Sequence, residues 1–271
     1  MRRAGTEGAH GPQAQKVPAK CDVKVLVRCD NGRVTGLRIV EVEPPELAAV
    51  HRDLLTPNFP PHELGPESDL VTEVEDGTAS ALASVDADGN REGVAVGHWD
   101  AAHRVWLLSH LAVDPARRAG GVGGRLLDAV VERWAKSSRP CAVLAEVEHP
   151  ASVPGKPAWG DPRRRFEFYV RHGARVLNLP YFQPALGKKA ERAYGMLLVV
   201  LHLDREFQLT ADRVSPVPVR GFLEDYFRSS EGGLPDDPAG LALLASTERP
   251  GGIELIDPAT TPIGHLPRSH A

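Results

Sequence analysis

The sequence has few cysteines, and their positions exclude two kinds of protein. Only three occur in 271 residues, at Cys21, Cys29 and Cys141, and no two have the C-x-x-C spacing. An odd number at such spacings argues against a disulfide framework and against a thiolate metal site. The 11 histidines form no H-x-x-x-H or H-E-x-x-H pattern, so no metal centre is predicted.

Two further absences concern the surroundings of the protein. No apolar run approaches the ~20 residues that a membrane-spanning helix needs. The basic N-terminus is not followed by the apolar segment of a secretory signal, so we expect a cytoplasmic protein with no membrane partner. The 32 basic and 36 acidic residues nearly balance, with a net charge of −4. This balance argues against a nucleic-acid partner.

The composition is that of a globular protein, with 42% hydrophobic and 25% charged residues. Residues 1–20 show no periodicity and are predicted to be a disordered tail. Residues 21–230 are predicted to form a single domain that begins with a β-hairpin turning at Asp30-Asn31-Gly32. Residues 231–271 are rich in glycine and proline, and we expect a loosely packed extension with a short strand or two, over 240–246 and 252–257.

The order of the elements predicts an α+β protein with a mixed sheet. A nearly all-apolar strand over 104–113 is followed by an amphipathic helix from Val122 to Trp134 and by an apolar strand over 141–148. A strand–helix–strand unit of this length implies a parallel, right-handed crossover. The other expected elements are a helix over 46–55, a hairpin over 79–100, a helix that ends at Gly173, strands near 175–179 and 194–203, and a helix near 219–228.

A glycine-rich segment joins the apolar strand to the helix, and Arg118, Gly121, Gly123 and Gly124 are its notable residues. Glycine lets a ligand approach the backbone closely, and the first N–H groups of a helix are unpaired and favour anions. The segment is therefore a candidate cradle for a pyrophosphate. A Walker P-loop is excluded, because Arg125-Leu126 stand where Lys and Ser or Thr are required.

A dinucleotide fingerprint is the second interpretation of this segment. Ala119-x-Gly121-x-x-Gly124 is a tolerable variant of it, and Glu146 or Glu148 lies near the place of a ribose-binding acid. Two features argue against it. A polar segment separates the strand from the first glycine, and hairpins precede the strand where βαβ units would be expected.

A third interpretation fits best. The run Leu111-Ala112-Val113-Asp114-Pro115-Ala116-Arg117-Arg118-Ala119-Gly120-Gly121-Val122-Gly123-Gly124-Arg125-Leu126-Leu127 closely resembles motif A of the GCN5-related N-acetyltransferase (GNAT) superfamily. The run Phe168-Tyr169-Val170-Arg171-His172-Gly173-Ala174 resembles the F-Y-x-x-x-G-F motif of that family, with Ala174 in place of the usual aromatic. The resemblance covers roughly residues 37–203.

The resemblance implies a fold and a donor site. The fold is a central twisted mixed sheet of about six to seven strands flanked by helices, with a central strand pair that splays. The donor is acetyl-CoA or another acyl-CoA, whose pantetheine arm lies in the gap between those strands. No metal is implied. The residues that match the family's donor contacts are Leu111 and Val113 along the strand and Arg118, Ala119, Gly121, Val122, Gly123 and Gly124 around the pyrophosphate.

The resemblance also implies catalytic residues. Tyr169 matches the general acid that protonates the departing thiolate. The general base stays open, because Ser109-His110 stand where many relatives carry a glutamate. His110, whose unperturbed pKa suits a base near neutral pH, and Glu146 and Glu148 on the next strand are the candidates. Glu148 is alternatively a binding residue for a cationic amine.

The acceptor groups are expected in two loops rich in proline and aromatic residues. Phe59 and Glu63 come from the first of these loops, and Tyr181 and Phe182 from the second. Their compact, rigid character favours a small-molecule amine as the acceptor, which the sequence does not identify further. Residues outside a minimal domain are expected to shape this site or a homodimer contact.

The predicted function is thus an acyl-CoA-dependent N-acyltransferase, specifically an N-acetyltransferase in which the amine attacks the thioester directly. The absence of cysteine from both motifs agrees with a reaction without a covalent enzyme intermediate. Three alternatives stay open. They are a non-catalytic acyl-CoA-binding sensor, a transferase that uses a longer acyl-CoA or an acyl-carrier-protein donor, and an NAD(P)-dependent oxidoreductase.

Overall fold

The computed structural model describes residues 38–60, 63–151, 160–186 and 190–269. The predicted tail and most of the predicted N-terminal hairpin, with Cys21 and Cys29, lie outside the described residues. None of the described helices is long and apolar enough to cross a membrane.

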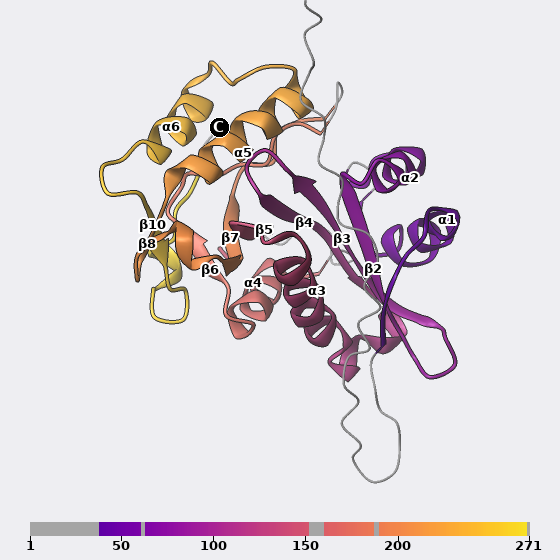
Figure 1. The fold of residues 1–271 in the computed structure, drawn as a ribbon. Helices are drawn as coiled ribbons and strands as arrows, with labels where there is room; N and C mark the ends of the chain where they lie inside the picture. Colours follow the sequence, from indigo (N-terminus) through magenta and orange to yellow (C-terminus); the bar gives the residue numbers. More distant parts are fainter. Residues whose placement is uncertain (1–37, 61–62, 152–159, 187–189, 270–271) are drawn as a thin grey trace, which may run out of the picture.

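A mixed sheet of ten strands runs through the molecule in the order β1-β2-β3-β4-β5-β7-β6-β10-β9-β8 (Figure 1). The predicted mixed sheet is confirmed, but the expected count of six to seven strands is wrong, because the C-terminal strands extend the sheet beyond β6. The strands are β1 (Arg38–Glu41), β2 (Ala79–Val85), β3 (Arg91–Asp100), β4 (Val105–Val113), β5 (Ala142–Glu148), β6 (Arg175–Leu177), β7 (Met196–Leu203), β8 (Gln208–Thr210), β9 (Arg213–Val214) and β10 (Ile253–Ile256).

Helices cover both faces of this sheet. The longer ones are α2 (Glu67–Glu75), α3 (Val122–Ser138), α4 (Pro162–Arg171), α5 (Pro216–Glu231) and α6 (Pro238–Thr247). The shorter ones are η1 (Pro44–Glu46), α1 (Leu47–Val50), the π-helix η2 (His51–Leu55), η3 (Pro115–Gly120), η5 (Arg205–Phe207) and η6 (Ile263–His265). The sequence predicted η1 to η2 as one helix but did not predict α2.

Alternate residues of β4 face opposite layers, as the period of a strand requires. Trp106 and Leu108 pack in a core cluster with α3 and α4. Val105 and Leu107 pack on the other face with α5 and α6. Helices α1 and α2 cover that second face over β2 and β3, with their own apolar cluster. The strand is therefore buried on both faces, as its apolar run predicted.

Helix α3 lies closely against β3 because Gly97 leaves room for an indole ring. A Cβ atom at Gly97 would lie 2.3 Å from Cη2 of Trp134. Trp134 stacks in turn on Trp106, with ring centroids 4.6 Å apart and an interplanar angle of 7°. This contact fixes the helix of the crossover on the sheet.

The crossover strands β4 and β5 pair in parallel over only part of their length. Their pairing begins at Val105↔Ala142 and ends at Leu108↔Ala145, although the structure describes both strands throughout. On its other side β4 carries a bulge, because Val96 lies opposite His110 while Gly97 lies opposite Leu108. A bulge bends its strand. The predicted splay of the central pair is thus confirmed, and it begins beside the bulge.

The C-terminal extension is not loosely packed, contrary to expectation. Leu243 on α6 and Ile253 and Leu255 on β10 are buried in the cluster that α5 shares with β7. The segment 240–246, expected as a strand, is helical because the Asp237 carboxylate caps the helix by accepting from the Ala239 and Gly240 N–H groups. Strand β10 pairs with β6 and continues the main sheet.

An arginine fastens the loop before β7 to the C-terminal helices. The Arg192 side chain, 18% exposed, pairs with Glu231 at 2.6 Å and with Asp237. Its guanidinium carbon lies 4.9 Å from the ring centroid of Phe182 and 5.9 Å from that of Phe227. The C-terminal extension is therefore held by charge as well as by apolar packing.

Candidate active site

The splayed ends of β4 and β5 and the start of α3 lie at one edge of the sheet. Parallel strands point their carboxyl ends to the same edge, and the glycine-rich turn follows β4 directly. Beyond the pairing limit, β4 continues from Ser109 to Val113 and β5 from Glu146 to Glu148. Most of the residues predicted for the donor and for catalysis lie on these two strand ends or beside them.

The turn after β4 is shaped by an aspartate and a glycine. The Asp114 side chain accepts from the Ala116 N–H at 2.9 Å and opens η3. Gly121 then adopts a φ of +69°, a left-handed conformation that favours glycine, and leads into α3. The predicted segment therefore ends on a helix N-terminus whose first N–H groups have no intrahelical acceptor.

The other two glycines of the motif have packing roles. A Cβ atom at Gly123 would lie 3.2 Å from Val113, and one at Gly124 would lie 2.6 Å from the His172 ring. Small residues there bring the start of α3 close to β4 and α4. Val122 is buried beside them.

Arg118 is exposed at the mouth of this turn. Its guanidinium donates from Nη2 to Oδ1 of Asn58 at 2.6 Å, which links the glycine-rich turn to the segment after η2. Leu111 and Val113 are half-buried on the unpaired end of β4, and Ala119 lies within η3. The residues predicted to contact the donor thus form a continuous path from the splay to the turn.

Tyr169 lies on α4, which packs on β5. Its side chain is 8% exposed and contacts Phe168 edge-on, with ring centroids 5.2 Å apart. Burial raises the pKa of Tyr169 to about 12. The phenol therefore keeps its proton at neutral pH, as a general acid must.

Glu146 stands at the start of the splay on β5 and accepts three hydrogen bonds. They come from the Tyr181 hydroxyl, from Gln183 Nε2 at 2.8 Å and from the Tyr226 hydroxyl at 3.5 Å. Burial raises the pKa of Glu146, and the three donors partly oppose this shift. Gln183 and Tyr226 were not predicted. Tyr226 comes from α5, which lies far from both motifs in the sequence.

The other two candidates for the general base are engaged elsewhere. The Nε2 atom of His110 lies 3.2 Å from the carbonyl oxygen of Glu63, and Phe59 contacts its ring edge-on at 4.8 Å. Burial lowers the pKa of His110 to about 4, which makes this imidazole a weak base. Glu148 forms an ion pair with Arg165 of α4.

The two predicted acceptor loops contribute differently. Phe59 and Glu63 lie beside His110, near the splay. Tyr181 reaches Glu146 with its hydroxyl. Phe182, expected to contact the acceptor, is instead fully buried between Phe227 and Arg192 and forms part of the core.

A polar chain that sequence reasoning did not predict runs from α2 to the bulge. His98 Nδ1 lies 2.6 Å from Ser109 Oγ, and His98 Nε2 lies 3.0 Å from Glu73 Oε2. The sequence contained a signal for one contact of this chain, that between His98 and Ser109. In a hairpin over β3 and β4, residues near 98 must lie opposite residues near 108, and the structure pairs His98 with Leu107.

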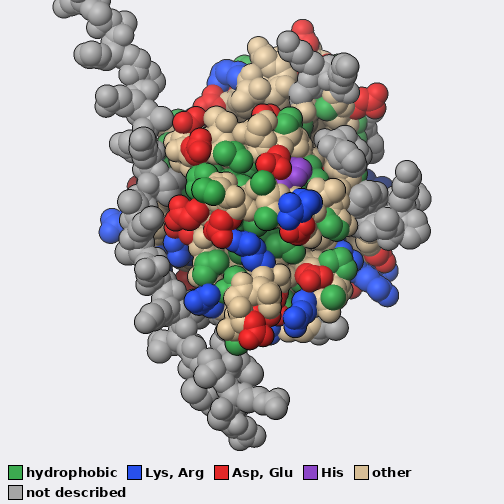
Figure 2. Space-filling view, turned by 90° about the vertical axis from the view of Figure 1, so that its right-hand side faces the viewer, with side chains coloured by type: hydrophobic (Ala, Val, Ile, Leu, Met, Phe, Trp, Pro, Cys, Tyr) green, Lys and Arg blue, Asp and Glu red, His purple; other side chains and the backbone are tan. Residues whose placement is uncertain are grey.

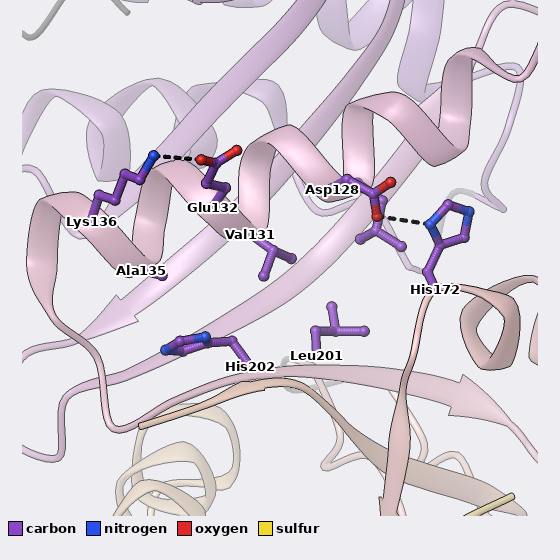
Figure 3. A pocket seen from close by; sticks show the side chains of 9 residues that line it. Asp128, Val131, Glu132, Ala135, Lys136, His172, Leu201 and His202 are labelled. Atoms are coloured by element: carbon purple, nitrogen blue, oxygen red, sulfur yellow. Dashed lines mark hydrogen bonds and ion pairs between the residues drawn. The ribbon is translucent and has the colours of Figure 1, made fainter. Parts of the chain in front are cut away.

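A surface hollow between α3 and β7 lies away from the splay (Figure 3). Its lining includes Asp128, His172 and His202. His202 lies opposite Val143, at the paired end of β5. On the side of the molecule that carries α1 and α2, acidic and basic side chains are interspersed (Figure 2).

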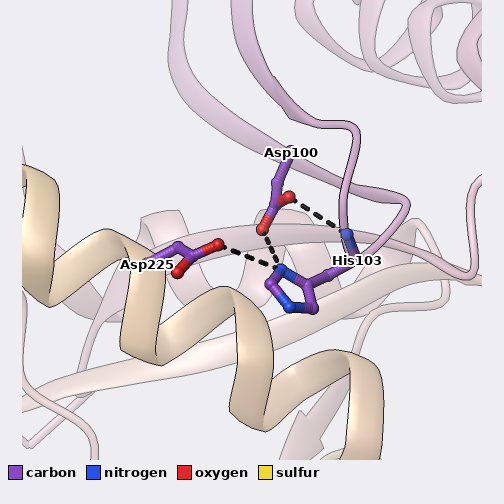
Figure 4. A group of neighbouring side chains, drawn as sticks. All are labelled: Asp100, His103 and Asp225. Atoms are coloured by element: carbon purple, nitrogen blue, oxygen red, sulfur yellow. Dashed lines mark hydrogen bonds and ion pairs between the residues drawn. The ribbon is translucent and has the colours of Figure 1, made fainter. Parts of the chain in front are cut away.

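One group of three among the described residues brings possible metal ligands together, although no metal site was predicted. The atoms of Asp100, His103 and Asp225 lie within 4.8 Å of one another (Figure 4). His103 Nδ1 lies 2.8 Å from Asp100 and 3.5 Å from Asp225, so these groups already satisfy one another. A Cβ atom at Gly221 would lie 2.1 Å from the His103 ring, so α5 can approach this turn only with glycine there. The group fastens α5 to the β3–β4 turn.

No protein-family model and no curated protein matches this chain. Solved structures of acetyltransferases are similar to it. One, assigned to the GNAT family and from Bacteroides thetaiotaomicron, has 25% identity and a TM-score of 0.49, over 63% of this chain and 90% of its own. An IAA acetyltransferase from Bacillus cereus has 16% identity and a TM-score of 0.42, over 62% and 100%. A mutant form of spermidine N-acetyltransferase SpeG from Vibrio cholerae has 12% identity and a TM-score of 0.45, over 61% and 94%.

Proposed function

We propose that the protein is an acyl-CoA-dependent N-acyltransferase of the GNAT superfamily, and that it moves an acetyl group from acetyl-CoA to the amine of a small molecule in the cytoplasm. One observation carries the proposal. The parallel pair β4 and β5 stops pairing at Leu108 and Ala145, at the same edge where a glycine-rich turn opens α3. A free strand edge, a gap and a helix start with unpaired N–H groups thus lie at one edge of the sheet.

The residues present fit an acyl-CoA. The unpaired end of β4 offers backbone groups to an extended chain such as the pantetheine arm. The first N–H groups of α3 and the exposed Arg118 suit a pyrophosphate. A dinucleotide fits less well, because β4 is antiparallel to β3 and a hairpin precedes it instead of a βαβ unit.

The reaction is one displacement at the thioester carbonyl. The amine nitrogen forms a bond to the carbonyl carbon and loses a proton to a general base, the carbon–sulfur bond breaks, and the thiolate takes a proton from Tyr169, which recovers one from water. The role of Tyr169 rests on its place in the second motif, and burial keeps its phenol protonated. Glu146, held by Tyr181, Gln183 and Tyr226, would border the acceptor.

The experiment is an assay of thiol release from acetyl-CoA with a panel of primary alkylamines and arylamines. We expect release that depends on one class of amine, and turnover about 10²-fold lower in Tyr169→Phe, as for loss of a general acid. The matched control is Tyr194→Phe, which changes an exposed tyrosine and should keep full activity. A protein that binds acetyl-CoA without transfer to any amine would support the sensor alternative and overturn the proposal.

A further inference from the structure

Three polar side chains from different elements form one hydrogen-bonded chain at the start of the splay. Glu73 lies on α2, His98 on β3 and Ser109 at the bulge of β4. Oγ of Ser109 lies 2.6 Å from Nδ1 of His98, and Nε2 of His98 lies 3.0 Å from Oε2 of Glu73. The imidazole therefore contacts a hydroxyl with one nitrogen and a carboxylate with the other.

The carboxylate sets the proton positions in this chain. An ionised carboxylate only accepts hydrogen bonds, so the Nε2 atom of a neutral His98 carries the proton. Nδ1 is then an acceptor, and the Ser109 hydroxyl donates to it. The Leu107 carbonyl oxygen, at 3.4 Å from the same hydroxyl, is a much weaker acceptor. The lone pairs of Ser109 Oγ are left to accept a further proton.

The hydrogen-bonded chain lies where β4 and β5 stop pairing, which is where the proposed reaction takes place. Ser109 directly follows Leu108, the last residue of β4 that pairs with β5. Glu146 directly follows Ala145, the partner of Leu108, on the opposite side of the gap. The other end of the chain reaches solvent, because the His98 and Glu73 side chains are 37% and 42% exposed. A proton received at Ser109 therefore has a route out of the site.

We propose that Ser109, His98 and Glu73 remove the proton of the attacking amine, with Ser109 touching the amine and the other two acting through it. This inference rests on the proposed function. As the nitrogen–carbon bond forms, the amine proton passes to Ser109 Oγ, and the hydroxyl proton of Ser109 passes to His98 Nδ1. The resulting imidazolium is paired with the Glu73 carboxylate and later releases its proton to water.

The other polar groups near the gap are less suited to this role. Nε2 of His110 is occupied by the Glu63 carbonyl oxygen. Glu146 already accepts three hydrogen bonds from protein donors. Of His110, Glu146 and His98, only His98 connects a hydroxyl at the gap to an exposed carboxylate.

The test measures kcat and KM of His98→Gln and Ser109→Ala with the fastest alkylamine of the panel. We expect kcat to fall about 10²-fold in each, the usual contribution of a general base, while the acetyl-CoA dissociation constant stays unchanged. The matched control is His202→Gln, a half-buried strand histidine at the paired end of β5, which should keep wild-type kinetics. Wild-type turnover in His98→Gln would overturn the inference.

The pH profile separates proton transfer from a structural role. In the wild type, kcat at saturating amine should rise with pH, and this limb should disappear in His98→Gln. Glu73→Gln keeps a hydrogen-bond partner for His98 but removes the charge that would pair with the imidazolium, so kcat should fall while the acetyl-CoA dissociation constant stays unchanged. The titratable groups near the chain are His51 from η2, His110 from β4 and Glu146 from β5, and Tyr226 from α5 contacts Glu146. If the limb survives unchanged in His98→Gln, one of these neighbouring groups causes it, and the inference is wrong.

Two further results distinguish this inference from the proposed function. An acetyl group found on Ser109 by mass spectrometry, after incubation with acetyl-CoA alone, would make Ser109 a nucleophile and overturn the proton-transfer role. A wild-type protein that acylates no amine of the panel overturns the proposed function itself, and the inference with it.

Discussion

Replacement of Gly121 by glutamate should weaken the binding of CoA about a hundredfold while the fold is retained. Gly121 precedes α3 with a φ of +69°, at the position where the turn would meet the pyrophosphate. A glutamate there adds a negative charge beside the phosphates. Gly121→Gln is the matched control, because it has the same size and the same backbone conformation without the charge.

The substitution has two effects: the backbone conformation lowers the stability of both variants, and the charge lowers the affinity of the glutamate variant. Both variants place a side chain in the left-handed region, at a cost of about 1–2 kcal/mol in stability. A Cβ atom would lie 3.3 Å from Nη1 of Arg125, an exposed side-chain end that can move away. Two like charges 4 Å apart repel by about 4 kcal/mol at an effective dielectric constant of 20. After screening by salt, about 3 kcal/mol should remain, which is about a hundredfold in affinity.

Titration calorimetry of CoA on the wild type and both variants measures this directly. Chemical denaturation should give equal free energies of unfolding for Gly121→Glu and Gly121→Gln. The glutamate variant should bind about a hundredfold more weakly than the glutamine variant, and the difference should shrink as salt is added. Equal affinities in the two variants would refute the placement of the phosphates at this turn.

Two predictions concern the stability of the fold. Gly97→Ala should destabilise the protein by about 1–3 kcal/mol, because its Cβ would lie 2.3 Å from the Trp134 ring; a free energy of unfolding equal to that of the wild type in urea would contradict this. Arg192→Met should cost about 3 kcal/mol, since it leaves the Glu231 and Asp237 carboxylates without their partner. A third prediction concerns pH. Arg192 lowers the pKa of both carboxyls. The stability that the two ion pairs contribute is therefore complete above the ordinary pKa values of these carboxyls, and it is lost as the pH falls through the lowered values. The unfolding midpoints of Arg192→Met and of the wild type should therefore converge as the pH is lowered from 7 to roughly 2.

The sequence predicted the part of the fold that local patterns determine. The apolar run before Asp114, the glycines after it and the amphipathic helix from Val122 are enough to define β4, α3 and the parallel strand β5. The bulge at Ser109 was not predictable, because it depends on how β3 and β4 are aligned. The splay was predicted from a family resemblance, and no local pattern indicated it.

The C-terminal part was predicted less well because its stability comes from distant contacts. Leu243 and Ile253 pack in one cluster with strands that lie far away in the sequence, and glycine and proline suggested looseness. The same limit applies to the site. Nothing near Tyr226 or His98 in the sequence indicates that one reaches Glu146 and the other Ser109. His110 looked suitable from its ordinary pKa, and burial lowers that pKa to about 4.

We propose above that an acyl-CoA binds between β4 and β5 with its pyrophosphate at the start of α3. The most direct measurement is thermal unfolding of the wild type with acetyl-CoA, CoA and NAD(P)H in parallel. A ligand present at 100 times its dissociation constant stabilises the folded state by about 2.7 kcal/mol, which is easily detected. We predict stabilisation by acetyl-CoA and CoA alone. Stabilisation by NAD(P)H, or by none of the three, would contradict the claim.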